Sequence, residues 1–255
     1  SSLGSSGTAS AKLTVNPPPL FSKSFAPNPS IIGGVVTLTF VIDNSASTAS
    51  ANDLDFTDTL PAGLQVADPA NAMNDCSGGT LSATPGSGTI TYASGSVSSS
   101  STCTLSVDVT ATAAGDLVNT TGELTSSLGT SDPAEATLRV NPPPTFAKAF
   151  QPPEILLGDV ATLVFEINNS TSTAAAADLD FTDTLPAEIV IADPANAATD
   201  CEGGILTADA GTDLIAYTGG IVDEKSTCTV SVDVTSDVLG MHLNTSSELT
   251  SSLGT

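Results

Sequence analysis

Apolar and polar residues alternate along most of this chain, and no stretch shows the spacing of an amphipathic helix. The two clearest runs are residues 35–42 and 104–109, each with three large apolar side chains on one face. Shorter runs predict strands at residues 21–25, 54–60, 63–66, 89–92, 117–124 and 136–140. Residues that favour turns separate the runs, and the pair Gly78-Gly79 is one such marker. Short strands with frequent turns predict an all-β fold.

The pattern repeats with a constant offset of 125 residues, from Cys76 to Cys201 and from residues 56–61 to residues 181–186. Seven or eight short strands in about 120 residues are typical of an immunoglobulin-like β-sandwich. We therefore predict tandem immunoglobulin-like β-sandwich domains. Modules repeated end to end are typical of stalks and fibres.

The phase of the repeat predicts three segments: residues 1–15 as the closing strand of a preceding or neighbouring repeat, 16–140 as a complete repeat, and 141–255 as a repeat lacking its last strand. Ala11, Leu13 and Val15 are the candidate donor-strand residues. Two explanations are open. The chain is a stretch of a longer array, or the first strand of one subunit completes the last domain of the next by strand addition.

Composition narrows the classes of partner. The formal charge is -23 with only 5 Lys+Arg, which argues against nucleic acid and anionic membranes. No stretch is apolar enough for membrane insertion. No GxSxG or HExxH motif occurs and His242 is the one histidine, so we do not expect an enzyme. The expected partners are further copies of the same repeat, by self-association in a fibre.

The four cysteines fall two per repeat with the same spacing. We predict two disulfides within the repeats, Cys76 with Cys103 and Cys201 with Cys228, and hence an extracellular or cell-surface location. The alternative is buried free thiols, because cysteine is a common core residue.

Residues 56–64, with residues 37–44 before them and 117–121 after them, resemble the DUF11-like repeats of bacterial surface proteins. They also resemble the pilin-type, Cna-like immunoglobulin folds. The resemblance covers nearly the whole repeat, and its most specific part is the string Thr-Asp-Thr-Leu-Pro at residues 57–61. The resemblance implies strand-rich, tandem and surface-exposed modules.

Lys23 shares one strand face with Phe21 and Phe25, and Lys148 repeats this arrangement. A buried ammonium tends to lose its proton, and the neutral amine is a nucleophile. The resemblance to pilin-like domains implies an internal isopeptide bond formed by a Lys, Asp and Asn trio. Carried over by position, the trios are Lys23, Asp58 and Asn119, and Lys148, Asp183 and Asn244.

The asparagine is the uncertain member of each trio. Alternation counted back from Leu124 places Asn119 on the outer face unless a bulge intervenes, and Asn44 with Asn169 is the fallback. In the competing interpretation, Lys23 reaches water from an edge strand and Asp58 merely ends its strand.

Acidic residues suggest a calcium site, because Ca²⁺ prefers oxygen ligands. The candidate ligands are Asp53, Asp55, Asp178 and Asp180, and none has EF-hand spacing. No other cofactor is expected.

Together these features predict a structural repeat of an extracellular filament, stalk or surface layer, propagated by tandem repetition or by strand donation between subunits. The alternative is an adhesin that recognises a glycan or a host protein. Tryptophan is absent, and every Phe and Tyr falls at an expected core position, which argues against an aromatic binding surface.

Overall fold

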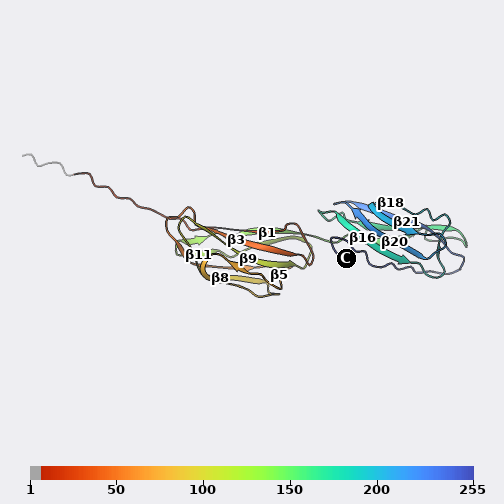
Figure 1. Ribbon diagram of the computed structural model, residues 1–255, viewed down its shortest axis with the longest axis horizontal. Helices are drawn as coiled ribbons and strands as arrows, with labels where there is room; N and C mark the ends of the chain where they lie inside the picture. Colours follow the sequence, from red (N-terminus) through yellow and green to blue (C-terminus); the bar gives the residue numbers. More distant parts are fainter. Residues whose placement is uncertain (1–6) are drawn as a thin grey trace, which may run out of the picture. The chain divides into compact units, whose positions relative to one another are not determined.

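The computed structural model describes residues 7–255, in which every regular element is a β-strand (Figure 1). The chain divides into two compact units. One contains the described residues up to 26, with 36–109 and 118–137; the other contains 27–35, 110–117 and 138–255. We call residues 16–140 the first repeat and residues 141–255 the second repeat.

The first repeat contains two five-stranded sheets and one three-stranded sheet. One large sheet has the order β1 (Leu20–Ala26), β3 (Val35–Asp43), β9 (Thr102–Ala111), β5 (Leu64–Val66), with β6 (Met73–Asn74) also paired to β9. The other has the order β12 (Gly129–Ser131), β11 (Leu124–Ser126), β4 (Ala51–Thr59), β8 (Thr89–Val97), β7 (Ser77–Ala83). The small sheet has the order β10 (Gly115–Thr120), β13 (Glu135–Asn141), β2 (Ser30–Ile31). This is the predicted immunoglobulin-like sandwich.

The core follows the predicted alternation. Leu38, Phe40 and Ile42 of β3 are fully buried, and the residues between them are half-buried. The rings of Phe40 and Phe56 lie 5.0 Å apart, which joins the two large sheets through an aromatic contact.

Gly78 and Gly79 lie inside β7 and not in the predicted turn. Gly79 has φ +74, and a Cβ at this position would lie 2.6 Å from the Tyr92 hydroxyl oxygen. Tyr92 Oη donates a hydrogen bond to the Gly78 carbonyl at 3.2 Å. Residue 79 must therefore be glycine because the Tyr92 side chain packs against the strand at this point. The sequence had suggested a turn here because glycine is also common in turns.

The predicted strand at residues 117–124 is two strands. β10 ends at Thr120 and β11 begins at Leu124, with an isolated bridge from Thr121 to Asp58 between them. The break changes the phase of alternation, so Val118 is exposed and Asn119 is fully buried. The predicted outward orientation of Asn119 was wrong for this reason.

β13 closes the first repeat. It lies between β10 and β2, and it pairs in parallel with β2 through Val140 and Ser30. Its side chains Leu138 and Val140 are fully buried. By contrast, Leu13 and Val15 of the matching segment near the amino terminus are 87% and 83% exposed, and residues 7–19 form no strand.

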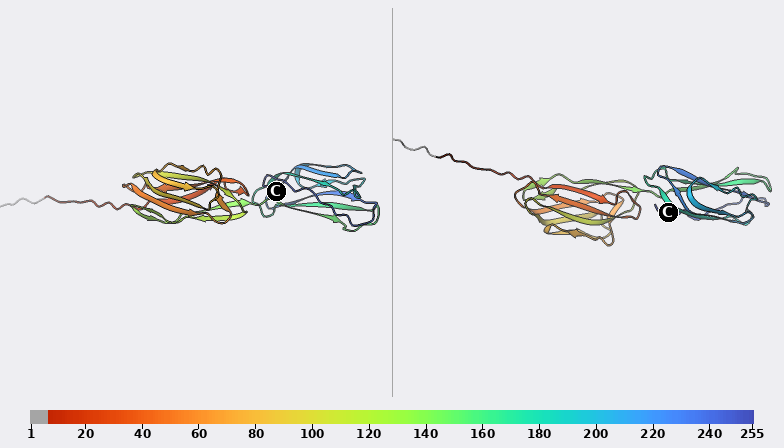
Figure 2. Two further views of the ribbon diagram at one scale, coloured as in Figure 1. Left: turned by 90° about the horizontal axis from the view of Figure 1, so that it is seen from below. Right: turned by 45° about the horizontal axis from the view of Figure 1, so that its top comes forward.

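The second repeat keeps one large sheet with five strands, whereas its other sheet has three strands in place of five. Figure 2 shows these strands from two further directions. One sheet has the order β14 (Thr145–Gln151), β15 (Val160–Asn168), β21 (Thr227–Thr235), β17 (Val190–Ile191), with β18 (Ala198–Thr199) paired to β21. The other has the order β16 (Ala176–Thr184), β20 (Leu214–Val222), β19 (Glu202–Ala208). Residues 155–156 and 240–245, the counterparts of β2 and β10, form no strand.

Candidate cross-link site

Three polar side chains meet inside the apolar core of the first repeat. Lys23 Nζ on β1 lies 3.3 Å from both carboxylate oxygens of Asp58 on β4. Asn119 Nδ2 on β10 donates a hydrogen bond to Asp58 Oδ2 at 2.9 Å. The predicted trio therefore comes together around the carboxylate, from three strands that are far apart in sequence.

The side chains of Lys23 and Asp58 have no exposed surface. Burial lowers the pKa of Lys23 from its ordinary value, and the neighbouring charges of Asp58 and Glu135 oppose this shift. Lys23 thus does not reach water from an edge strand, and Asp58 lies within β4. Glu135 had not been singled out from the sequence, because nothing local connects it to a lysine on the first strand.

The amide oxygen of Asn119 is buried and accepts no hydrogen bond among the described residues. The two orientations of an asparagine amide differ by an exchange of Oδ1 and Nδ2. In the exchanged orientation, Oδ1 would face Asp58 and could accept a proton from its carboxylic acid. Asn44, the fallback, is occupied elsewhere, since its Nδ2 donates to the carbonyls of Ala49 and Ser98.

The second repeat contains the same trio. Lys148 Nζ lies 2.7 Å from Asp183 Oδ2, and Asn244 Nδ2 donates to the same oxygen at 2.9 Å. The Asp183 side chain is fully buried, whereas the Lys148 side chain is 17% exposed. Asn244 Oδ1 is also buried without a hydrogen-bond partner among the described residues.

This arrangement contains every group needed for amide exchange. A proton that moves from the lysine ammonium to the aspartate leaves a neutral amine beside a neutral carboxylic acid. The amine is a nucleophile, and the acid can protonate the amide oxygen of the asparagine. In the first repeat, the side chains of Lys23 and Asp58 are fully buried, so water does not compete for the same protons there.

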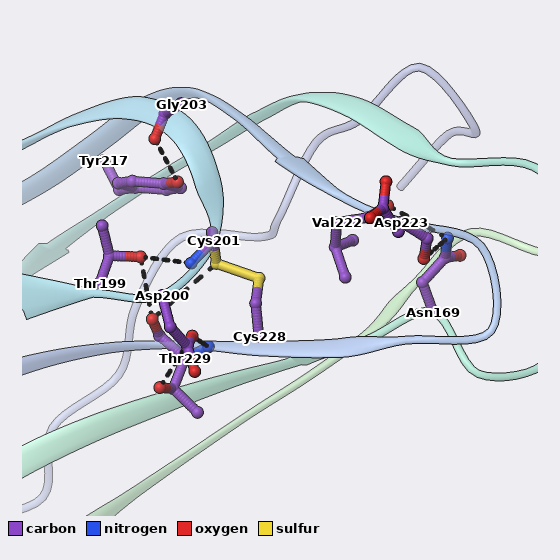
Figure 3. The surroundings of a disulfide bond; sticks show 10 residues. All are labelled: Asn169, Thr199, Asp200, Cys201, Gly203, Tyr217, Val222, Asp223, Cys228 and Thr229. Atoms are coloured by element: carbon purple, nitrogen blue, oxygen red, sulfur yellow. Dashed lines mark hydrogen bonds between the residues drawn. A yellow bond between two sulfur atoms is a disulfide. The ribbon is translucent and has the colours of Figure 1, made fainter.

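Disulfides join Cys76 to Cys103 and Cys201 to Cys228, each across a sequence separation of 27 residues. This is the predicted pairing, and no cysteine is free. Figure 3 shows the second bond, beside the hydrogen bond from Tyr217 Oη to the Gly203 carbonyl. Asp200 accepts hydrogen bonds from the backbone nitrogen and hydroxyl of Thr229, next to Cys228. Hydrogen bonds between the residues next to the two cysteines thus hold the strand ends at the disulfide together.

The candidate calcium ligands do not converge. Asp55 accepts a hydrogen bond from the Ser94 backbone nitrogen, and Asp180 accepts one from Gly219. Asp53 and Asp178 have φ 53, in the left-handed region at irregular positions of their strands. Within residues 7–255, the only close groups of three ligand types combine an aspartate with the two cysteines of a disulfide: Asp75, Cys76, Cys103 and Asp200, Cys201, Cys228.

In the part of the chain that the structure describes, no helix has the length and apolar character required to cross a bilayer. No curated protein sequence matches this chain.

Several solved structures are similar to this chain at low sequence identity. The C-terminal domain of the antigen I/II-family protein AspA of Streptococcus pyogenes is 11% identical, with 94% of this chain and 97% of that chain covered and a TM-score of 0.51. The collagen adhesin of S. aureus is 11% identical over 93% and 88% of the two chains, with a TM-score of 0.31. The 35 kDa C-terminal fragment of the major pilin GBS80 of Streptococcus agalactiae is 11% identical over 92% and 85%, with a TM-score of 0.37. The AspA domain therefore shares the fold of this chain.

A family match covers both repeats, at residues 19–140 and 144–255. The family is not the DUF11 family that residues 56–64 resemble. The match extends over nearly all of each sandwich, including both lysines, both aspartates and both asparagines of the trios. The chain belongs to the family described as domain of unknown function DUF7933.

Proposed function

We propose that this chain is a structural module of an extracellular stalk, fibre or surface layer, and that each repeat is closed by an internal isopeptide bond between lysine and asparagine. The observation that carries the proposal is the trio of Lys23, Asp58 and Asn119, which is buried in the first repeat and recurs in the second. The disulfides support the extracellular location, because such bonds persist in oxidising compartments.

The reaction needs no group from outside the chain. The neutral amine of Lys23 attacks Cγ of Asn119 while the carboxylic acid of Asp58 protonates the amide oxygen. A new bond forms between Nζ and Cγ, the bond between Cγ and Nδ2 breaks, and the proton lost by Nζ leaves with the departing nitrogen as ammonia. Asp58 ends in the same protonation state in which it began the attack, so it acts as a proton shuttle.

Such a bond suits a permanent structural role. It joins the first strand of the repeat to β10, which lies late in the repeat's sequence, so it restricts the unfolded chain more than a bond across a short loop does. The disulfide closes a shorter loop that lies within this larger one. Together the two bonds would resist unfolding and digestion outside the cell.

Intact mass spectrometry of the full chain tests this proposal. We expect the folded protein to lack the mass of at least one ammonia, and peptide mapping to find Lys23 and Asn119 in one branched peptide. Asn119→Ala removes the electrophile and should restore the mass expected for an unlinked first repeat. Asn44→Ala, a control at another buried asparagine, should retain the link. An unmodified mass for the folded wild-type chain would refute the proposal.

An adhesin role is the competing function. Seven of the ten aromatic side chains are buried, and the other three, Phe21, Phe146 and Phe150, are half-buried. A surface with few accessible aromatic rings lacks the usual anchors for glycans and protein partners. Specific glycan or cell binding by the full chain would favour the adhesin role.

A further inference from the structure

The asparagine of each trio also begins a sequence of the form Asn-x-Ser/Thr. Residues 119–121 are Asn-Thr-Thr, and residues 244–246 are Asn-Thr-Ser. This pattern is the acceptor sequence for N-linked glycans, which are attached to Nδ2 of the asparagine. Nδ2 is also the nitrogen that the proposed cross-link releases as ammonia. The same atom in each repeat can therefore take part in either of two reactions.

The folded first repeat has no room for a glycan at this atom. Asn119 is fully buried, and its Nδ2 donates to Asp58 Oδ2 at 2.9 Å. Its Oδ1 is buried as well, so exchanging the two amide atoms does not bring Nδ2 to the surface. Because protein interiors are close-packed, a sugar cannot be inserted there without opening the repeat. A glycan can be attached to Asn119 only before the repeat folds.

A second pair of asparagines provides a comparison within the chain. Asn44 and Asn169 are buried at matching positions, and Nδ2 of each donates to loop carbonyls. Asn169 begins the sequence Asn-Ser-Thr, whereas residues 44–46 are Asn-Ser-Ala and do not form an acceptor sequence. Asn28 is followed by Pro29, which also excludes it. Asn119 therefore begins the one acceptor sequence of the first repeat, and this repeat gives the simpler test.

We propose that Asn119 and Asn244 accept an oligosaccharide from a lipid pyrophosphate donor while the chain is unfolded, and that the glycan and the cross-link exclude each other. The exclusion rests on the cross-link proposed above. In the transfer, a bond forms between Nδ2 and C1 of the first sugar, and the bond between C1 and the pyrophosphate oxygen breaks. One proton passes from Nδ2 to a base of the transferase, and the lipid pyrophosphate leaves.

Each reaction prevents the other. A glycosylated Nδ2 cannot enter the core beside Asp58, so Lys23 does not reach Cγ of Asn119 in a closed repeat. Once the cross-link has formed, the nitrogen has left as ammonia and no acceptor atom remains. Whichever reaction comes first is therefore permanent, and the order of glycan transfer and folding decides whether a repeat is cross-linked.

Cell-free synthesis of the full chain tests this competition. A lipid-linked oligosaccharide and an oligosaccharyltransferase that recognises Asn-x-Ser/Thr are added either during synthesis or after folding. Peptide mapping by mass spectrometry then distinguishes a glycan, a cross-link and an unchanged amide at residue 119. Thr121→Ser keeps the acceptor sequence, as Ser246 does in the second repeat, and Thr121→Ala removes it without changing Asn119. Asn44 is the buried asparagine that should stay unmodified in both arms.

With the transferase present during synthesis, we expect a glycan on Asn119 in the wild type and in Thr121→Ser, and none in Thr121→Ala. Glycosylated first repeats should lose their protease resistance and contain no cross-link. Thr121→Ala also removes a hydrogen bond from the Ala134 nitrogen, so the unglycosylated wild-type molecules of the same sample serve as the second control. These molecules should fold and cross-link. With the transferase added after folding, Asn119 should carry no glycan.

The possible failures are distinguishable. An unmodified Asn119 during synthesis, when a peptide of residues 116–124 is glycosylated by the same enzyme, would overturn the acceptor role and leave the proposed function intact. Glycan transfer to the folded repeat, or a glycosylated first repeat that resists protease, would overturn the exclusion. An unglycosylated folded chain that keeps its full mass would overturn the proposed cross-link and with it the competition.

Discussion

The two repeats hold the same three reactive side chains in the same strand register and in different surroundings. Lys23 lies opposite Phe40, and Lys148 lies opposite Phe165. The aspartates are both fully buried, and both asparagines donate at 2.9 Å. The lysines differ, because Lys148 retains contact with water and Lys23 does not.

The comparison separates the residues of the proposed cross-link from the residues that create their environment. Lysine and aspartate come from strands present in both repeats, and asparagine comes from β10 or its counterpart. In the first repeat, Ala134 and Glu135 belong to neither set: Ala134 exchanges hydrogen bonds with Thr121, and the charge of Glu135 acts on Lys23. The sequence can therefore contain all three residues of the trio while the burial and charge around the lysine depend on a further strand.

Removing the aspartate should give the largest difference between the repeats. In a chain with Asn119 and Asn244 both replaced by alanine, so that no isopeptide bond can form, Asp58→Ala leaves the Lys23 ammonium buried without its partner, and we expect a loss of about 3–5 kcal/mol in the free energy of unfolding of the first repeat. Asp183→Ala should cost less, since Lys148 can be solvated. Hydrogen exchange measured repeat by repeat in the full chain gives both values. Glu123→Ala, at an exposed carboxylate, serves as the control. Equal losses at Asp58 and Asp183 would contradict the difference in burial.

Removing the disulfides should affect the repeats equally. Both bonds span the same sequence separation, so the double substitutions Cys76→Ser/Cys103→Ser and Cys201→Ser/Cys228→Ser should each cost about 3–4 kcal/mol. The measurement is calorimetry with Asn119 and Asn244 both replaced by alanine, so that no isopeptide bond can form. A clearly larger loss in one repeat would show that the disulfides contribute through different surroundings.

The smallest expected effect is on pH dependence. In an Asn119→Ala chain, Lys23 stays free to titrate, and its folded-state pKa lies below the ordinary value of 10.5. Between these two values the unfolded state binds more protons, so the unfolding free energy of the first repeat should rise as the pH rises through this window. Denaturation from pH 8 upward, at steps of about one unit, measures the slope. Lys23→Met should remove it, and a stability that falls in this window would contradict the assignment to Lys23.

Much of the fold could be predicted from the sequence, because alternation reports the buried face of each strand directly. The repeat, the main strands and the cysteine pairing depend on this pattern and on spacing. The orientation of Asn119 could not be predicted in this way, since it depends on where β10 ends and β11 begins. The strand β7 was hidden for a similar reason: Gly79 is fixed by contact with Tyr92, which is distant in sequence.

The trio could be located from strand alternation and the family resemblance, but its environment could not. Glu135, the first residue of β13, acts on Lys23 of β1 through its charge, although most of the repeat's sequence separates the two residues. Such a contact is set by the arrangement of whole sheets, and no local pattern encodes it. The difference between Lys23 and Lys148 therefore needed the structure.

The positions of Lys23 on β1 and Asn119 on β10 also determine how a pulled module would behave. β1 is the first strand of the repeat, and only β11, β12 and β13 follow β10, so a covalent bond between β1 and β10 would carry tension past all the strands between them. The strands in between, with the loop closed by Cys76 and Cys103, would bear almost none of the load. Under force such a module could lengthen only by the residues outside the bond, which include β11, β12 and β13, while the strands between Lys23 and Asn119 would not be extended.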